Sequence, residues 1–414
     1  MRLAAALGSI TIGESMTLLC LASYEKGFDF LREAKRHGAR VLLLTSLSLK
    51  DTVEWPRESL DDIFFMPDTQ KQWNRTDTLK AIAHLMRSTA IDRIVPLDDF
   101  DLEMAAFLRE HFRLPGLGES QTRFFRDKLA MRNQAAKHGL RVPEFVGVLN
   151  HRALADYMDR VPPPWVLKPR LMAGAIGIKK VDSREKFWEL ANALGDESSF
   201  YLLEKYTPGD VYHVDTIVSG GEIRFAIASR YGAPPMDVSH AGGIFTTKIV
   251  EHGTPLERAL LDANAAVMRA MGLTDGVSHT EFIVGREDKE VYFLETSARV
   301  GGANIADLIE AASGVNPWRE WARIECATPE RPYSLPETRN DYAGLLVTLA
   351  RQEWPDTSGF TEPELCWRMK KKHHLGLIVR STNESRVAEL LDVYVDRARR
   401  DYLAVLPPKE RPTE

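Results

Sequence analysis

Hydrophobic positions in the first part of the chain form short apolar runs that alternate with segments of helical spacing. The runs that predict buried strands are Met16–Ala22, Val41–Leu44 and Asp92–Leu97. The segments that predict helices are Gly27–His37, Thr78–Ser88 and Leu102–His111. Alternation of strand and helix favours a doubly wound parallel sheet, and the chain has no GxGxxG motif of the kind that binds dinucleotides.

The pattern changes after Leu114-Pro-Gly-Leu-Gly, which we interpret as a domain boundary. A basic amphipathic helix is predicted over Gln121–His138, and short strands with glycine-bearing turns predominate after it. Two more helices are predicted, at Pro255–Met271 and Asn304–Ala312.

From about residue 336 the chain has the pattern of a small α/β unit. Its predicted strands and helix are Ala343–Leu349, Gly376–Val379 and Glu384–Asp401, and residues 407–414 are expected to be disordered. We therefore predict an α/β protein of three domains. These are an N-terminal doubly wound domain at 1–114, a central domain of two α+β subdomains at 115–335 with a lid at about 145–200, and a C-terminal α/β domain at 336–414.

Two short apolar strands, His279–Val284 and Glu290–Glu295, flank a turn and predict a β-hairpin. Glu281 and Glu295 lie on these strands, and because paired strands lie side by side we expect both carboxylates to face one point. Hard oxygen ligands of this kind suit Mg²⁺ held against phosphates. An acidic hairpin at a solvated surface is the alternative interpretation of these residues taken alone.

The composition is that of an ordinary soluble globular protein, with 44% hydrophobic and 27% charged residues. A formal net charge of −5 argues against a general nucleic-acid binder. The three cysteines lack metal-type spacing, so we expect neither a zinc site nor a disulfide scaffold. No apolar stretch approaches the ~18 residues of a membrane span, and the start of the chain lacks a secretion signal. We therefore expect a cytoplasmic protein without a membrane partner.

Three further features carry candidate chemistry. Lys168 closes a short strand before a loop with two glycines, and such a loop can wrap phosphates with backbone N–H groups. Glu204 ends another strand, where a carboxylate can bind the exocyclic amine of adenine. Each feature is also typical of an ordinary hairpin or a solvated turn. Asp98 and Asp99 follow a predicted strand, where helix N-capping is favoured over lining a ligand crevice.

Taken in order, these pieces resemble the ATP-grasp superfamily, specifically its carboxylate–amine ligase branch. The resemblance covers about residues 115–320 and rests on a helix lysine, a strand lysine with a glycine loop, and the motifs LLEKY, HTEF and LETSARVGG. It implies ATP and Mg²⁺ as cofactors, with Mn²⁺ able to substitute. The residues that it implies for nucleotide binding are Lys128, Lys168, Met172, Gly174, Gly177, Glu204, Lys205, Tyr206 and His213, with Asp215 as a weaker candidate. It further implies Glu281, Glu295 and Ser297 as metal ligands and Arg299 as the catalytic residue.

One position departs from the family pattern, because the usual Glu-x-Asn ends here in Ser297, and a serine hydroxyl is a poorer metal ligand than an asparagine carbonyl. For the substrate pocket we predict His240 and Lys248 of the loop 231–248, together with Gly301 and Gly302. Arg224 is an alternative carboxylate-binding residue, and an exposed strand arginine is an equal alternative.

These residues together predict an ATP-dependent ligase that activates a carboxylate as an acyl phosphate and joins it to an amine. The expected partners are small-molecule carboxylate and amine substrates, without nucleic acid, and a homodimer remains open. Two alternatives are kept. One is a bicarbonate-using carboxylase or carbamoyl-phosphate-type enzyme, and the other is a non-catalytic ATP-binding protein, which only Ser297 favours.

Overall fold

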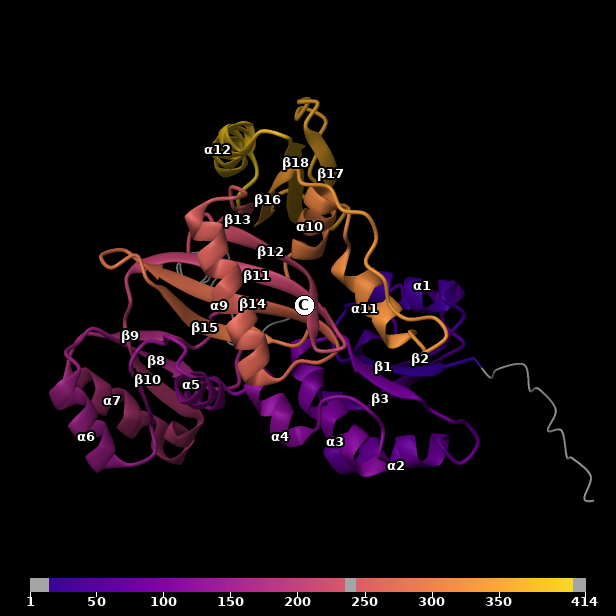
Figure 1. Cartoon of the computed structure of the whole chain (residues 1–414), viewed down its shortest axis with the longest axis horizontal. Coiled ribbons are helices and arrows are strands. Elements are labelled where there is room, and N and C mark those ends of the chain that lie inside the picture. Colours follow the sequence, from indigo (N-terminus) through magenta and orange to yellow (C-terminus); the bar gives the residue numbers. More distant parts are fainter. Residues whose placement is uncertain (1–14, 235–242, 405–414) are drawn as a thin grey trace, which may run out of the picture.

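The computed structural model of the chain describes residues 15–234 and 243–404. The predicted disordered tail at 407–414 and the candidate His240 lie outside the described residues. Within the described ranges the strands form three main sheets and a two-stranded ribbon, β4 (Asp68–Thr69) with β5 (Gln72–Trp73). Figure 1 shows the N-terminal sheet and the lid at the lower right and lower left of a central sheet, with the C-terminal strands above it.

The N-terminal sheet is parallel, with the strand order β3-β2-β1-β6. Alternate residues of β1 face opposite ways: Leu18 and Cys20 pack toward α1 and α11, and Leu19 and Leu21 pack toward α2 and α3. Helices thus cover both faces, which confirms the doubly wound prediction. The bounds are β1 (Thr17–Ala22), α1 (Phe28–Arg36), β2 (Arg40–Ser46), β3 (Asp62–Met66), α2 (Arg75–Leu85), β6 (Arg93–Pro96), α3 (Leu102–Phe112) and α11 (Pro317–Glu325).

The single helix that we predicted over Gln121–His138 is wrong, because the chain breaks it before Lys128. A short helix α4 (Glu119–Thr122) and one 3₁₀ turn precede α5 (Lys128–Lys137). Asp127 is the N-cap of α5, and its carboxylate accepts from the N–H groups of Leu129 at 3.0 Å and Ala130 at 3.4 Å. The cap places Lys128 in the first turn of a new helix, where its side chain reaches the centre of the molecule.

The lid is an antiparallel sheet of order β7-β10-β8-β9 with two helices on one face. Trp165, Leu167 and Leu203 pack against these helices. Because side chains alternate along a strand, Lys168 and Glu204 point to the opposite face. The bounds are β7 (Phe145–Gly147), α6 (His151–Arg160), β8 (Trp165–Pro169), β9 (Lys179–Val181), α7 (Arg184–Leu194) and β10 (Tyr201–Lys205).

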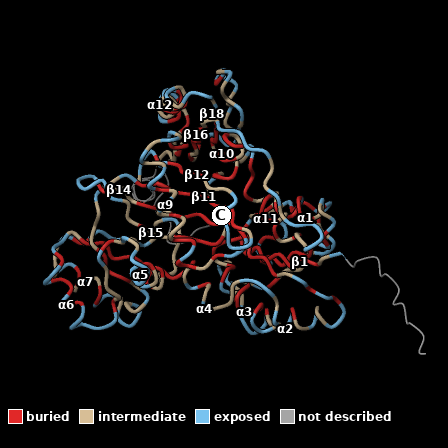
Figure 2. Tube along the Cα trace, viewed as in Figure 1, coloured by how far each residue is buried: buried red, intermediate tan, exposed pale blue. Residues whose placement is uncertain are grey.

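The central sheet is antiparallel throughout, with the order β15-β14-β11-β12-β13-β16-β18-β17. Tyr212 and Val214 of β11 pack with α9 on one face, whereas His213 and Asp215 turn toward the other. The bounds are β11 (Gly209–Ser219), β12 (Glu222–Tyr231), β13 (Phe245–Ile249), α9 (Pro255–Met271), β14 (Gly276–Gly285), β15 (Val291–Ser297) and α10 (Ile305–Ser313). Figure 2 shows that buried residues follow these strands through the middle of the molecule.

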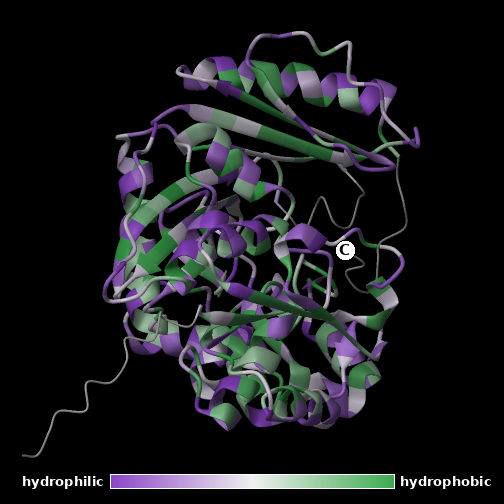
Figure 3. Ribbon diagram, turned by 90° about the vertical axis from the view of Figure 1, so that its right-hand side faces the viewer, coloured by the Kyte–Doolittle hydropathy of each residue, from purple (hydrophilic) through white to green (hydrophobic). Residues whose placement is uncertain are grey.

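The C-terminal strands are not a separate sheet, because β16 pairs with β13 and so extends the central one. Helix α12 covers these strands, and Figure 3 shows hydrophobic and hydrophilic residues interleaved along the helix at the top. The bounds are β16 (Tyr342–Leu349), β17 (Leu365–Arg368), β18 (His374–Ser381) and α12 (Glu384–Asp401). The domain boundaries at 114 and 335 remain predictions. No helix in the described part of the chain is long and apolar enough to cross a membrane.

Candidate active site

A cavity of about 490 Å³ lies where the three sheets meet. The N-terminal sheet contributes Asp98 and Asp99, the lid contributes Lys168 and Glu204, and the central sheet contributes the hairpin of β14 and β15. The predicted residues that line this cavity are Lys128, Lys168, Met172, Gly174, Glu204, Lys205, Tyr206, Glu281, Glu295, Ser297, Arg299 and Gly302.

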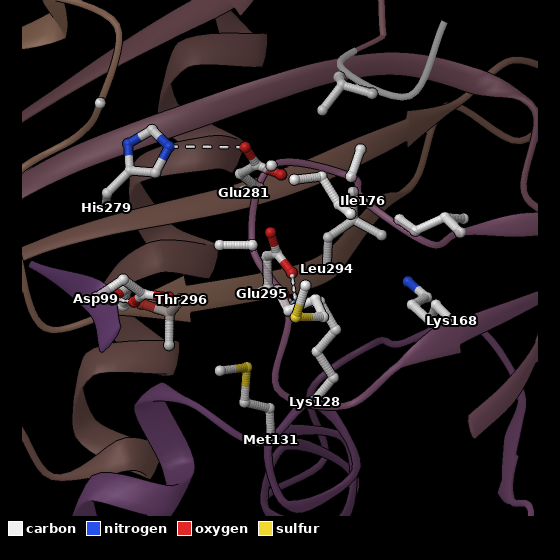
Figure 4. A pocket seen from close by; sticks show the side chains of 18 of the residues that line it. Asp99, Lys128, Met131, Lys168, Ile176, His279, Glu281, Leu294, Glu295 and Thr296 are labelled. Atoms are coloured by element: carbon white, nitrogen blue, oxygen red, sulfur yellow. Dashed lines mark hydrogen bonds and ion pairs between the residues drawn. The ribbon is translucent and has the colours of Figure 1, made fainter. Parts of the chain in front are cut away.

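Glu281 and Glu295 are direct partners in the antiparallel register of β14 and β15. Paired residues of an antiparallel ladder lie on the same face, so the predicted hairpin brings both carboxylates into the cavity, as Figure 4 shows. Each carboxylate has its own partners. Lys128 Nζ lies 2.7 Å from Glu295 Oε2, and the Tyr231 hydroxyl donates to Glu281 Oε1 at 2.9 Å.

Lys168 and Glu204 form an ion pair on the cavity face of the lid. The second oxygen of Glu204 accepts from Arg132, with Nη2 at 3.0 Å and Nε at 3.1 Å. Burial would raise the pKa of Glu204, but Arg132 and Lys168 outweigh it and hold the pKa below its ordinary value. Glu204 therefore orders Lys168, a role that the sequence did not predict for it. Arg132, which is fully buried, was also missed among the basic residues of the helix.

Two cations, one at the start of α5 and one in the turn before it, hold the glycine loop after Lys168. Arg126 Nη2 donates to Leu171 O at 2.8 Å, and Lys128 Nζ donates to Met172 O at 2.6 Å. Gly174 lines the cavity with a φ of 67°. Gly177 does not line it, and a Cβ there would lie 2.9 Å from the ring of Pro169. Gly177 thus permits the loop to pack on the strand.

We expect this loop to exchange its amides rapidly without nucleotide and slowly with it. The Met172 carbonyl is held by Lys128, and a phosphate group would compete for that ammonium and reorganise the loop. Hydrogen exchange over 172–177, measured with and without saturating ATP analogue and Mg²⁺, checks this. The turn at 286–289 of the β14–β15 hairpin serves as an internal control, and equal protection of 172–177 in both states would contradict the prediction.

The strand end after Glu204 differs in detail from the expected adenine contact. The N–H of Lys205 donates to Glu144 O at 2.8 Å, and that of Tyr206 donates to Pro164 O at 3.0 Å. Both N–H groups are therefore occupied, and the nucleotide-binding role of Lys205 and Tyr206 remains a prediction for their other atoms. Thr207 also lines the cavity, and among the described residues its N–H has no backbone acceptor. We add Thr207 to the candidate residues.

Asp99 lines the cavity, a role that we had ranked below helix capping, and it joins the N-terminal sheet to the hairpin. Its carboxylate pairs with Arg126, accepts from the Ser297 hydroxyl and lies 3.8 Å from Arg299 Nε. Burial would raise the pKa of Asp99, but Arg126 and Arg299 keep it low. Asp98 has the expected capping role, since its side chain accepts from Phe100 N at 3.0 Å. Ser297 therefore meets a carboxylate here, and its role as a metal ligand remains a prediction.

His213 does not line the cavity, which corrects its implied place among the nucleotide-binding residues. It is fully buried, with Nδ1 2.6 Å from Asp215 Oδ2 and Nε2 2.8 Å from Thr247 Oγ1. Asp215 also accepts from His279 Nδ1 at 2.9 Å. Burial would lower the pKa of His279, but Asp215 outweighs it and raises the pKa to about 9.

Two predicted substrate residues lie away from the cavity. Lys248 pairs with Glu384 of α12, because alternation along β13 turns Phe245 and Thr247 inward and Lys248 outward. Gly301 faces the buried Asp215 and His279, each 3.0 Å from the place a Cβ would occupy. Both assignments are therefore withdrawn. Gly302 lines the cavity and has open space at its Cβ position.

Arg224, the alternative carboxylate-binding residue, lies outside the cavity. Its Nη1 lies 2.9 Å from Glu222 Oε2, and the side chain is 43% exposed.

The donor set of the cavity fits a nucleotide with Mg²⁺. Two facing carboxylates supply hard oxygen ligands, and Lys128, the partner of Glu295, is a cation of the kind that phosphate oxygens attract. Lys168 adds a second ammonium across the cavity, visible in Figure 4. The residues that would hold the metal are Glu281 and Glu295.

Comparisons with known proteins agree with this geometry. The chain is 26% identical over 247 residues to the L-arginine-specific L-amino acid ligase of Bacillus subtilis, an alignment that spans 58% of this chain and 59% of the relative. It is 22% identical over 348 residues to the carbamoyl phosphate synthase large chain of Campylobacter jejuni, spanning 81% of this chain and 30% of the relative. The chain thus aligns with less than two thirds of the length of these relatives. No protein-family model matches it.

The structure of an L-amino acid ligase from Bacillus licheniformis superimposes with a TM-score of 0.75 at 16% identity, covering 96% of this chain and 100% of that one. This likeness shows the fold. Together with the sequence relatives, it confirms the resemblance to the ATP-grasp superfamily and its carboxylate–amine ligase branch.

Proposed function

We propose that this chain, which has the ATP-grasp fold, is an ATP-dependent ligase that activates a carboxylate as an acyl phosphate and joins it to an amine. The observation that carries the proposal is the pairing of Glu281 with Glu295 in one cavity that also holds two lysines and Arg299. The relatives named above are ligases of amino acids or an enzyme of carbamoyl phosphate synthesis, which supports this class of reaction.

The lysines bind and orient the triphosphate in the proposed reaction. Lys128 exchanges Glu295 for phosphate oxygens, and Lys168 extends past Glu204 toward them. Mg²⁺, or Mn²⁺ in its place, neutralises phosphate charge when bound between Glu281 and Glu295. The glycine loop excludes water from the activated acyl group.

The chemistry proceeds in two balanced steps. A carboxylate oxygen of the first substrate attacks the terminal phosphorus of ATP, and ADP leaves with the electrons of the broken P–O bond. The amine nitrogen then attacks the acyl carbon, phosphate leaves, and the amine loses its proton. Arg299 lies in the cavity within 3.8 Å of Asp99, where its guanidinium can face the transferring phosphoryl group. A carboxylate needs this activation because its own oxygen is a poor leaving group.

The cavity wall beyond the carboxylate pair supports amino acids as the substrate class. Lys26 and Asp98 lie 3.4 Å apart there, so both signs of charge are present for a zwitterion. Tyr24 and Phe100 lie beside them, with ring centroids 5.5 Å apart. Such a wall suits a small molecule with charged and apolar parts. We place the reaction in the cytoplasm, where ATP is available.

The proposal predicts that phosphate release from ATP requires a carboxylate and an amine together. We would incubate the protein with Mg²⁺, ATP and amino acids singly and in pairs, and follow phosphate and the amide product. Release with bicarbonate and ammonia, but not with amino-acid pairs, would favour a carbamoyl-phosphate-type enzyme. Tight ATP binding without release under any pair would identify a non-catalytic ATP-binding protein.

A further inference from the structure

Six side chains form two rows on the cavity face of β11, β14 and β15. The register places His213 beside Glu281 and Glu281 beside Glu295 in one row. The same register places Asp215 beside His279 and His279 beside Ser297 in the second row, two residues further along each strand. His279 thus lies directly behind one of the two proposed metal carboxylates.

The contacts of His279 define its orientation. Its Nδ1 bonds to a carboxylate oxygen of Asp215, which only accepts, so Nδ1 carries a proton. The Tyr231 hydroxyl donates to Glu281 Oε1 and lies 3.2 Å from His279 Nε2. That same nitrogen lies 3.6 Å from Glu281 Oε1. His279 therefore lies between two sets of partners, with Nε2 directed at the Glu281–Tyr231 pair and Nδ1 directed at Asp215.

Asp215 is itself held in place by a second histidine, His213. It accepts from His213 Nδ1 at 2.6 Å, and His213 is fixed in turn by Thr247 at 2.8 Å. His213, Asp215 and His279 are 0%, 3% and 7% exposed. Gly301 closes the row, since any Cβ there would lie 3.0 Å from Asp215 and from His279. The backbone at Gly301 therefore packs closely against this chain of hydrogen bonds.

The two metal carboxylates therefore differ in how they are held. Glu295 is paired with Lys128, a flexible side chain that phosphate can draw away. Glu281 lies beside a buried imidazole ring that is anchored on its far side by Asp215.

We propose that His279 is a positioning residue for Glu281 and is itself held in place by Asp215 and His213. Glu281 is then the metal ligand with a fixed position, and Glu295 is the metal ligand whose partner can be displaced. The inference rests on the proposed nucleotide and metal site. Partners that orient a ligating carboxylate typically change metal affinity by about 10–100-fold when they are removed.

The test compares two variants of His279 in which a side-chain amide takes the place of one of the two ring nitrogens. His279→Asn keeps a group near Nδ1 for Asp215 but loses the donor to Glu281, and His279→Gln places its amide near the Nε2 position. We would measure the dissociation constant of Mn²⁺ from the ADP complex by electron paramagnetic resonance, and ADP affinity without metal separately. We expect His279→Asn to weaken Mn²⁺ binding by about 10–100-fold, His279→Gln to weaken it less, and metal-free ADP binding to stay unchanged.

Asp215→Asn is the second variant, because it preserves shape while removing the charge that orients His279, and it should weaken Mn²⁺ like His279→Asn. His252→Asn is the matched control, since His252 pairs with Glu257 at 2.8 Å outside the cavity. Wild-type Mn²⁺ affinity in the folded variants, or equal loss in the Asn and Gln variants, would overturn the positioning role alone. No Mn²⁺ binding by the wild-type ADP complex would overturn the proposed metal site itself.

Discussion

Replacing Glu281 with glutamine is expected to lower turnover by more than about 100-fold, since the loss of a direct ligand should exceed the effect of losing its supporting partner. A neutral amide keeps the size of the side chain but binds Mg²⁺ weakly. The same reasoning applies to Glu295→Gln, which also releases Lys128 from its 2.7 Å ion pair. Because Glu281 is anchored by Tyr231 and His279, its replacement should have the larger effect on metal affinity.

The measurement is steady-state phosphate release as a function of Mg²⁺ concentration, with thermal unfolding to verify the fold. Glu290→Gln is the matched control, because Glu290 closes the turn of the same hairpin, lies 3.2 Å from Arg141 and is 49% exposed. We expect that control to behave as wild type. Full turnover by Glu281→Gln, or a nucleotide complex whose metal lies far from both carboxylates, would remove these residues from the metal site.

The hairpin was predictable because its information is local. Two apolar strands on either side of a turn predict the hairpin itself. The pairing of Glu281 with Glu295 also depends on a register shift between Glu281 and Phe282, because without it Glu281 would pair with Leu294. The doubly wound sheet was predictable for a similar reason, since β1 and β2 are short apolar runs each followed or preceded by helical spacing. Both predictions depend on segments of fewer than about thirty residues.

Asp99 was misjudged because its partners are distant in sequence. Ser297 lies 198 positions away, and nothing in the local pattern of Asp98-Asp99 distinguishes the cap from the residue that faces the cavity. Arg132 raises the same difficulty, since Glu204 is 72 positions away. Side chains that join separate sheets become visible only when the sheets are packed.

Other errors had local signals that could have been used. Asp127 is a strong N-cap type, so its position before Lys128 indicated a new helix start rather than a continuous helix. His279 lies two residues before Glu281, which places both on one face of the strand. Lys248 had no such local signal. The face to which its side chain points depends on the residue at which β13 begins after the loop, and the sequence does not define that residue.

Arg299→Lys should lower kcat by about 1000-fold, the lower end of the effect of a catalytic arginine on phosphoryl transfer, because lysine retains the charge but lacks the planar fork. KM for ATP and for both substrates should change little, since the lost interaction forms mainly in the transition state. Arg299 already directs Nη1 to Val300 O at 2.8 Å and Nε toward Asp99 at 3.8 Å, so the guanidinium has a defined orientation that an ammonium cannot reproduce.

The decisive comparison separates kcat from KM in the same assay. Arg224→Lys is the control, because that arginine lies on β12 with Nη1 2.9 Å from Glu222 Oε2 and does not line the cavity. We expect it to leave both constants unchanged. A raised KM for one substrate with kcat preserved in Arg299→Lys would instead assign Arg299 to holding that substrate in its ground state. Full activity of the variant would exclude Arg299 from the reaction. Among the described residues, Arg126 is the other arginine that lines the cavity, and it is already paired with Asp99.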